Sequence, residues 1–170
     1  MFNQRKKLGE ATNEDQIEHN AHLERKDDAR CQKEQDKQRA VSDPKYHTVT
    51  FDLQAVLTTP CSRVSQLYYK RKLQCYNLTV YSLSDKKVAC YLWSETDAKR
   101  GSNEIGTCIY KYIKSLPPHV KHVCLYSDSC AGQNRNRYVA NLLHHIVSTG
   151  DNLEIIDQKF LETGHTQIGV

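Results

Sequence analysis

The chain has 170 residues, 38% of them hydrophobic, and a formal net charge of +4 at pH 7 with a pI near 8.6, an excess of positive charge that favours an anionic partner. This length accommodates one compact domain, and no apolar run reaches the roughly 20 residues that a bilayer-spanning helix needs. Seven cysteines are scattered singly with no signal-peptide pattern before them, so we expect reduced thiols in an intracellular protein without a membrane segment.

The first 44 residues are predicted to form a charged helical arm or linker. Residues 12–40 contain no Pro or Gly and are mostly charged or Gln, with few apolar side chains such as Ile17 and Leu23. Such a segment favours helix but buries little, so we expect it to pack only lightly against the rest of the chain. Pro44 marks its end. A coiled coil or a DNA-contacting helix is the alternative, for which a sustained heptad seam is missing.

Residues 45–170 are predicted to form a single domain that starts with three antiparallel strands. β-Branched and aromatic residues alternate with polar ones in the first, and a turn-rich stretch of hairpin length joins the second to the third. The stretch 58–65, which contains Pro60, is expected to be a loop. The three expected strands span residues 46–56, 73–81 and 88–93.

After these strands the apolar pattern changes to helical spacing. Residues 105–116 follow a helical period, with Ser102 as the expected N-cap, and Pro117 ends that helix. A continuous apolar run over 122–127 is typical of a strand that is buried on both faces. A second amphipathic helix over 138–147 and a fifth strand over 153–161 follow. The order β-β-β-α-β-α-β predicts an α/β fold with a mixed five-stranded sheet of the RNase H-like kind, although a generic α+β domain shares this order.

Asp52 and Asp128 are the candidate catalytic and metal-binding residues. They fall within the first expected strand and at the end of the fourth, which are neighbours in an RNase H-like sheet. Phosphodiester cleavage in this fold uses carboxylates that hold two divalent cations about 4 Å apart, and Mg²⁺ or Mn²⁺ accepts such oxygen ligands. Simpler interpretations stay open: Asp128 caps a turn, and Asp52 has a polar partner or faces solvent.

A series of motifs resembles an uncharacterised, transposon-derived protein family of insects and other invertebrates, which is itself similar to DDE-type transposases with an RNase H-like fold. The resemblance covers about the whole chain and implies Asp52 as the first and Asp128 as the second acid of a metal-dependent site, DNA as partner, a nuclear location and possible oligomers. The motifs are Phe51-Asp52-Leu53-Gln54, Tyr68-Tyr69-Lys70-Arg71-Lys72-Leu73, Tyr76-Asn77, Tyr91-Leu92-Trp93-Ser94-Glu95, Arg100-Gly101-Ser102-Asn103-Glu104-Ile105, Ser127-Asp128-Ser129-Cys130-Ala131-Gly132-Gln133-Asn134-Arg135-Asn136 and Phe160-Leu161-Glu162-Thr163-Gly164-His165-Thr166.

The third acid is where this chain departs from the family pattern. In the family the Gly-His-Thr motif leads into an acidic segment and a helix that would carry the third acid, whereas here residues 167–170 follow it. The domain is therefore expected to lack the C-terminal helix with the third acid. Glu104 is the substitute to consider, because RNase H takes an acid from its first helix. A favourable charge at a helix N-terminus is the simpler interpretation of Glu104.

Two basic segments are candidate nucleic-acid contacts. Backbone N–H groups and side chains at the start of the second helix could hold a DNA phosphate beside the acids, or could form an ordinary capped helix start. A mixed aromatic and basic stretch could line a strand-binding groove, or could be a partly buried loop. The candidate residues are Gln133, Asn134, Arg135 and Arg137 in the first segment, and Lys70 and Arg71 in the second.

Two functions are compatible with these features. One is a transposase or nuclease domain that cleaves or joins DNA with Mg²⁺ or Mn²⁺. The other is a non-catalytic domesticated module that keeps the fold and binds nucleic acid or protein. Because only two of three acids can be identified, we expect an enzyme ancestry and a catalytically inactive chain.

Overall fold

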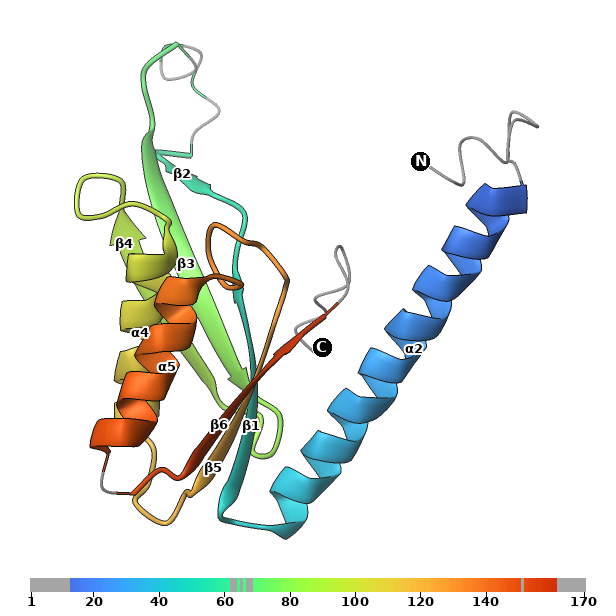
Figure 1. Ribbon diagram of the computed structural model, residues 1–170. Coiled ribbons are helices and arrows are strands. Elements are labelled where there is room, and N and C mark those ends of the chain that lie inside the picture. The colour runs from blue at the N-terminus through green and yellow to red at the C-terminus, as the bar shows by residue number, and fades with distance from the viewer. Residues whose placement is uncertain (1–12, 62–63, 65, 67–68, 151, 162–170) are drawn as a thin grey trace.

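The computed structural model describes residues 13–61, 64, 66, 69–150 and 152–161 (Figure 1). Tyr68, Glu162 and residues 163–170, on which part of the motif series falls, lie outside the described residues. The described elements are α2 (Asn13–Ser42), β1 (Tyr46–Leu53), β2 (Leu57–Thr59), β3 (Leu73–Ser82), β4 (Val88–Ser94), α4 (Ser102–Lys114), β5 (His122–Ser127), α5 (Arg137–Thr149) and β6 (Ile155–Phe160).

The strands form one mixed six-stranded sheet with β1 near its centre. β1 runs antiparallel to β3 and parallel to β5, while β4 pairs with the other edge of β3 and β6 runs parallel to β5. β2 pairs antiparallel with the first residues of β3, on the edge that β1 uses further along. With β2 counted as a continuation of β1, the order across the sheet is β4-β3-β1-β5-β6.

The main core lies between the sheet and the two helices α4 and α5, which pack side by side on one face (Figure 1). Alternate residues of the central strands, such as Val49 and Phe51 of β1, point into this core and are almost completely buried. The two helices approach closely at Gly106, where an added Cβ would come within 2.9 Å of Leu142 Cδ2. The apolar faces of α4 and α5 therefore cover the sheet face that the alternate, buried side chains of the strands form.

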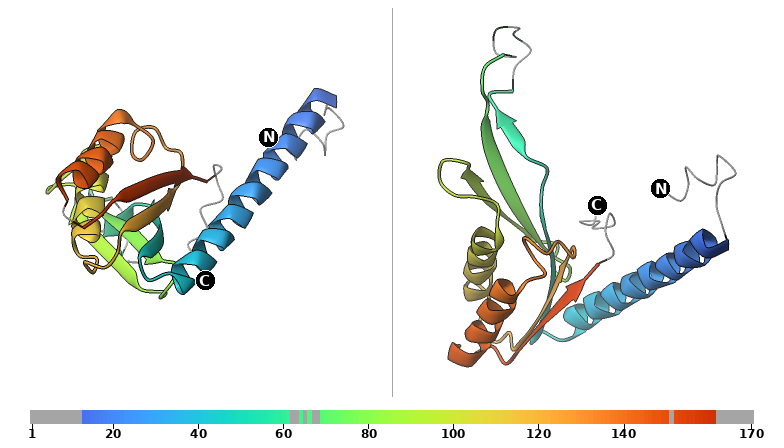
Figure 2. Two further views of the ribbon diagram at one scale, coloured as in Figure 1. Left: turned by 60° about the horizontal axis from the view of Figure 1, so that its bottom comes forward. Right: turned by 45° about the horizontal axis from the view of Figure 1, so that its top comes forward.

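α2 contacts the opposite face of the sheet through its last turns, and its N-terminal part extends away from the domain (Figures 1 and 2). Ala40 is buried there with Tyr46 and Tyr126. The Asp36 carboxylate accepts hydrogen bonds from Tyr126 Oη at 2.5 Å and Lys159 Nζ at 2.5 Å. The expected helix is confirmed, but its end packs more firmly against the domain than expected. The partly buried Asp36 carboxylate anchors it there, and a count of apolar residues does not register such an anchor.

Three further expectations need correction. The sheet has six strands rather than five, because β2 forms within the stretch expected to be a loop. Its three residues are exposed and pair through backbone groups, so no alternation of buried side chains marks them. The N-cap of α4 is Gly101 rather than Ser102. β6 begins at Ile155, two positions after the expected start. Within the described part of the chain, none of the helices has both the length and the apolar character that crossing a bilayer requires.

Candidate functional site

Asp52 and Asp128 lie at the same level of the sheet on neighbouring strands. The parallel register pairs Thr48 with Cys124 and Thr50 with Tyr126, and the same offset takes Asp52 to Asp128, directly beyond the end of β5. Because side chains alternate along a strand, Asp52 lies on the face opposite to Phe51 and to the main core. The two acids that the sequence singles out are thus brought together.

The electrostatics of Asp52 reflect this arrangement. Burial raises the pKa of the Asp52 carboxyl, and the negative charge of Asp128 raises it further, while a hydrogen bond from the Leu53 backbone N–H acts in the opposite direction. Two carboxylates that repel one another in a partly buried place are a poor arrangement for an isolated protein. A bound cation would relieve that repulsion.

Asp128 also caps the turn that follows β5. Its Oδ1 atom accepts a hydrogen bond from the Cys130 backbone N–H at 3.3 Å and another from the Asn134 side-chain amide. The turn-cap interpretation of Asp128 is therefore correct. The cap uses the carboxylate oxygen Oδ1, and within the described part of the chain no hydrogen bond reaches the other oxygen, Oδ2.

Asn134 is buried beside Asp128, with 3% of its surface exposed. The sequence suggested that it could contact a DNA phosphate, but this burial removes it from the surface that a phosphate could reach. Sequence reasoning missed its position next to the acids because the turn between β5 and α5, rather than a periodic pattern, carries it there. The nearest signal in the sequence is the Gly132-Gln133-Asn134 stretch, which marks a turn without saying what the amide faces.

The other candidates at the start of α5 lie on or near the surface. Asn136 is the N-cap of α5, and its side chain accepts from two backbone N–H groups. Gln133 Nε2 donates to the Arg100 carbonyl at 3.4 Å. The exposed guanidinium of Arg135 lies 5.4 Å from the ring centre of Phe160, and the exposed Arg137 donates to Tyr138 Oη at 3.1 Å. The helix start is an ordinary capped one, as its simpler interpretation held, and it presents two exposed arginines next to the turn of Asp128.

Glu104 is not brought to the acid pair. Its carboxylate accepts backbone hydrogen bonds from Lys99 at 3.2 Å and Gly101 at 2.9 Å, so it caps the N-terminus of α4. α4 covers the face of the sheet that contains Phe51, whereas Asp52 belongs to the opposite face. The structure therefore favours the simpler interpretation, a carboxylate that stabilises a helix N-terminus.

Lys70 and Arg71 lie on a projection that β2 and the beginning of β3 form beyond the rest of the sheet (Figure 1). Both are exposed, and Arg71 Nη2 pairs with Glu95 Oε2 at 3.1 Å. We call the described residues of this segment, 54–61, 64, 66 and 69–75, the finger. They include Lys70, Arg71 and Lys72 and no Asp or Glu. The chain enters the finger two residues after Asp52, and Lys70, Arg71 and Lys72 come directly before β3.

The acid pair has oxygen atoms for a cation but few charged ligands. Among the described residues, no three or more His, Cys, Asp or Glu side chains form a group that could hold a metal ion. Three buried side-chain atoms in this part of the chain have no hydrogen-bond partner, Thr50 Oγ1, Asn77 Oδ1 and Asn134 Oδ1. Thr50 lies two residues before Asp52, and Asn77 lies two residues before Thr79, the β3 partner of Asp52. The unpartnered oxygens thus belong to the strands and the turn that hold the two acids.

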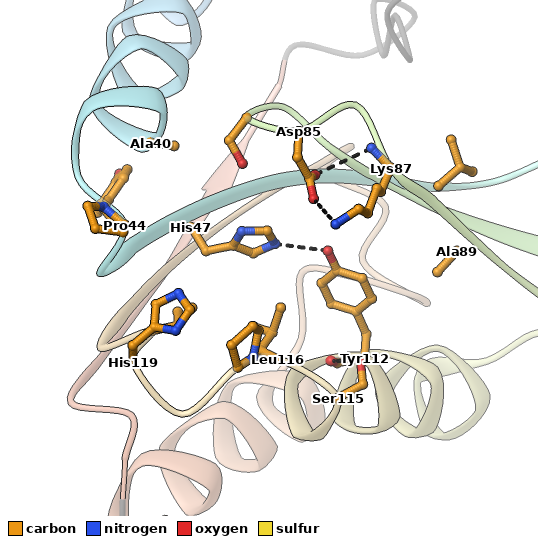
Figure 3. Close-up of a pocket in the computed structure, with 15 residues that line it drawn as sticks. Ala40, Pro44, His47, Asp85, Lys87, Ala89, Tyr112, Ser115, Leu116 and His119 are labelled. Atoms are coloured by element: carbon orange, nitrogen blue, oxygen red, sulfur yellow. Dashed lines mark hydrogen bonds and ion pairs between the residues drawn. The ribbon is translucent and has the colours of Figure 1, made fainter.

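A cavity of about 580 Å³ lies away from the acid pair, at the N-terminal end of β1 (Figure 3). The sequence gave no indication of it. His47 Nε2 and Tyr112 Oη share a hydrogen bond of 2.9 Å in this cavity, and Asp85 and Lys87 form an ion pair of 2.9 Å on one of its walls (Figure 3). Burial lowers the pKa of the His47 imidazole. Asp52 and Asp128 are not among the residues that line it.

No protein-family model, curated protein or solved structure matches this chain. We therefore infer its function from the geometry of the site.

Proposed function

We propose that this chain is an RNase H-like domain of transposase type, in which Asp52 and Asp128 bind Mg²⁺ or Mn²⁺ next to a nucleic-acid backbone. The observation that carries the proposal is the parallel register of β1 and β5, which sets the two carboxylates side by side at one end of the sheet. Central parallel strands that end in polar residues are a frequent place for sites in α/β proteins.

The sheet order supports the RNase H-like part of the proposal. The first strand of an RNase H-like sheet is central and neighbours the fourth, and β1 here lies between β3 and β5. Three antiparallel strands come first, and alternating helices and parallel strands follow. The short β2 is the addition to the expected pattern, and it continues the line of β1 rather than separating two neighbours.

The chemistry of the donor atoms supports a hard divalent cation. Carboxylate oxygens are ligands that Mg²⁺ and Mn²⁺ prefer, and the two negative charges match one such ion. When bound, the cation would polarise a phosphate oxygen and neutralise charge on it. Asp52 and Asp128 would hold the cation, and the turn that Asp128 caps would keep its carboxylate in a fixed orientation.

Exposed cations on the finger and at the start of α5 support a nucleic-acid partner. Lys70 and Arg71 extend on the finger, and Arg135 and Arg137 lie at the start of α5 directly after the turn of Asp128. Contacts from Lys and Arg to phosphates position a nucleic acid without reading its sequence. We therefore propose DNA backbone binding that depends strongly on salt.

A non-catalytic binding module is the second candidate, and the hydrogen bonds of Asp128 favour it. With one Asp128 oxygen used in the turn and Glu104 used in a helix cap, the described residues offer no third acid to the acid pair. We therefore propose cation and DNA binding as the function of this chain, with transposase-type chemistry as its ancestry.

Mn²⁺ titration of the full chain by isothermal calorimetry tests the proposal. We expect one binding event in the wild type, and at least about tenfold weaker affinity in Asp52→Asn and Asp128→Asn, because each removes one of two charged ligands. Glu104→Gln is the matched control and should bind Mn²⁺ like the wild type. Equal Mn²⁺ affinity in the wild type and Asp52→Asn, or no binding in either, would overturn the proposal.

A further inference from the structure

The turn between β5 and α5 holds Asn134 in a fixed place. The backbone N–H groups of Gln133, Asn134 and Arg135 all donate to the Cys130 carbonyl, at 3.2, 2.8 and 3.0 Å. Gln158 Nε2 of β6 donates to the Asn134 carbonyl at 2.9 Å. The chain therefore folds back after Asp128, and a neighbouring strand fixes it there. The Asn134 side chain is positioned before any ligand arrives.

The side-chain amide of Asn134 has an unfilled bonding capacity. Only 3% of the residue is exposed, and its amide nitrogen donates to Asp128 Oδ1. Its amide oxygen is buried and has no hydrogen-bond partner within the described part of the chain. Buried polar atoms are nearly always bonded, so the unpartnered oxygen shows that the Asn134 amide has an acceptor to spare.

A cation between Asn134 and Asp128 would use this acceptor once the amide turns its oxygen toward Asp128. An amide exchanges its oxygen and nitrogen by a half-turn about one bond. Without a cation, the NH₂ group faces the carboxylate, because two oxygens would repel. With a cation, the oxygen faces it instead. Adjacent ligand atoms of an octahedral Mg²⁺ lie roughly 3 Å apart, which is close to a hydrogen-bond distance, so little movement is needed.

We propose that Asn134 supplies the third oxygen ligand of a single divalent cation that Asp52 and Asp128 also hold. This inference rests on the proposed function of the two aspartates. Two carboxylates and one neutral amide balance the charge of one Mg²⁺ or Mn²⁺ without a further acid. The site is thus complete for binding one cation although no third acid reaches it among the described residues.

The competing explanation is that Asn134 acts only on Asp128, by donating the hydrogen bond that orients the carboxylate. Loss of Mn²⁺ affinity on mutation does not separate the two explanations. A change in metal preference does, because the atom that touches the metal determines which metals the site prefers. A thiolate ligand favours Cd²⁺ over Mn²⁺, whereas a carboxamide or carboxylate oxygen favours the harder ion.

Replacing Asn134 by Cys in the full chain provides this test. We expect Asn134→Cys to lose at least about tenfold in Mn²⁺ affinity and to bind Cd²⁺ with a new thiolate-to-metal absorption in the ultraviolet. The wild type, which has seven cysteines of its own, and Gln133→Cys at the neighbouring position are the matched controls. They give the background absorption from exposed thiols such as Cys130, which Asn134→Cys should exceed. Circular dichroism shows that each variant is folded.

Asn134→Asp is the second variant, in case Asn134→Cys does not fold. It keeps an oxygen at the position and adds a charge, so we expect tighter Mn²⁺ binding than in the wild type. A folded Asn134→Cys with wild-type Mn²⁺ affinity, or with no more Cd²⁺–thiolate absorption than the controls, refutes the ligand role of Asn134. If Asp52→Asn still abolishes Mn²⁺ binding in that case, the proposed function stands. If the wild type binds no Mn²⁺, the proposed function itself fails.

Discussion

At the scale of single residues, Asp52 shows how much a strand pattern can predict. An acid that alternates with core residues on a central strand must face the other side of the sheet, and the structure places it there. Asn134 shows the limit of the same reasoning. Its burial depends on a turn and on a bond from Gln158 of β6, and contacts between residues far apart in the chain leave no local signal.

The raised pKa of Asp52 predicts that its charge destabilises the metal-free protein. In the pH range between the ordinary aspartate pKa and the raised one, the folded state binds more protons than the unfolded state. Stability is therefore lost as the pH rises through that range. We expect Asp52→Asn to melt at a higher temperature than the wild type at pH 7, and the difference to shrink toward pH 4.

Thermal melts of both proteins from pH 4 to pH 8 in EDTA measure this effect. Asp27→Asn, a replacement of an exposed acid on α2, is the matched control and should follow the wild type at every pH. A lower melting temperature for Asp52→Asn at pH 7 would mean that the carboxylate makes a stabilising contact, which contradicts the argument from burial and repulsion.

At the scale of elements, the sequence predicts segments that have a clear apolar period and end at a Pro, Gly or turn residue. It does not predict a very short strand, or a helix that docks through a polar side chain. The expected strand 122–127 coincides with β5, and the helix expected over 138–147 lies within α5. β2 has three exposed residues, so its pairing with β3 depends on the tertiary fold. The docking of α2 depends on Asp36, whose partners Tyr126 and Lys159 are distant in the sequence.

The contacts of Asp36 predict that the C-terminal part of α2 stabilises the domain and that its N-terminal part does not. Asp36→Ala removes the partner of Lys159, whose side chain is only 25% exposed, and leaves the Tyr126 hydroxyl without an acceptor. We expect a loss of about 3 kcal/mol, at the lower end for buried pairs because Lys159 keeps some contact with water. Deleting residues 1–27 should change stability by less than about 0.5 kcal/mol, because surface changes rarely cost more.

Urea denaturation at pH 7 measures both changes. Glu34→Ala is the control on the same helix, since Glu34 pairs with Lys37 at 3.2 Å on an exposed surface and should contribute less than about 0.5 kcal/mol. If Asp36→Ala unfolds at the same urea concentration as the wild type, the last turns of α2 do not stabilise the domain, and the sequence-based expectation of a lightly packed arm holds along its whole length.

At the scale of the whole molecule, the distribution of charge predicts more than its sum. A net charge of +4 is compatible with many partners, but the described part of the finger carries Lys70, Arg71 and Lys72 and no acid of its own. The sequence identified Lys70 and Arg71, but it did not show that they project from the sheet, because the pairing of β2 with β3 creates the finger.

Replacing Lys70 and Arg71 by Ala should weaken DNA binding without changing the fold. Each lost phosphate contact should lower the slope of log affinity against log salt by about 0.9 for duplex DNA. Fluorescence anisotropy with a labelled duplex between 50 and about 200 mM salt measures that slope. Lys114→Ala, at the end of α4, is the matched control and should leave the slope unchanged. An unchanged slope in the double variant would exclude the finger as a phosphate-binding element.

The arrangement of acids also predicts that this chain binds a cation without cleaving DNA. Two-metal phosphodiester cleavage needs two cations about 4 Å apart, one for the attacking oxygen and one for the leaving oxygen. Asp52 and Asp128 carry two negative charges in all, enough for one cation, and Glu104 is occupied by backbone hydrogen bonds on the other face of the sheet.

We therefore expect no Mg²⁺- or Mn²⁺-dependent nicking of supercoiled plasmid DNA by the full chain, even at protein concentrations that saturate the plasmid. Asp52→Asn is the control that separates this chain from a contaminating nuclease, since any nicking that persists in the variant does not come from the acid pair. Nicking that Asp52→Asn abolishes would show that the pair is catalytic. Glu104→Gln would then identify the third negatively charged ligand. Lost activity in that variant means that Glu104 leaves its helix cap when DNA binds. Retained activity means that the DNA phosphates themselves hold the second cation.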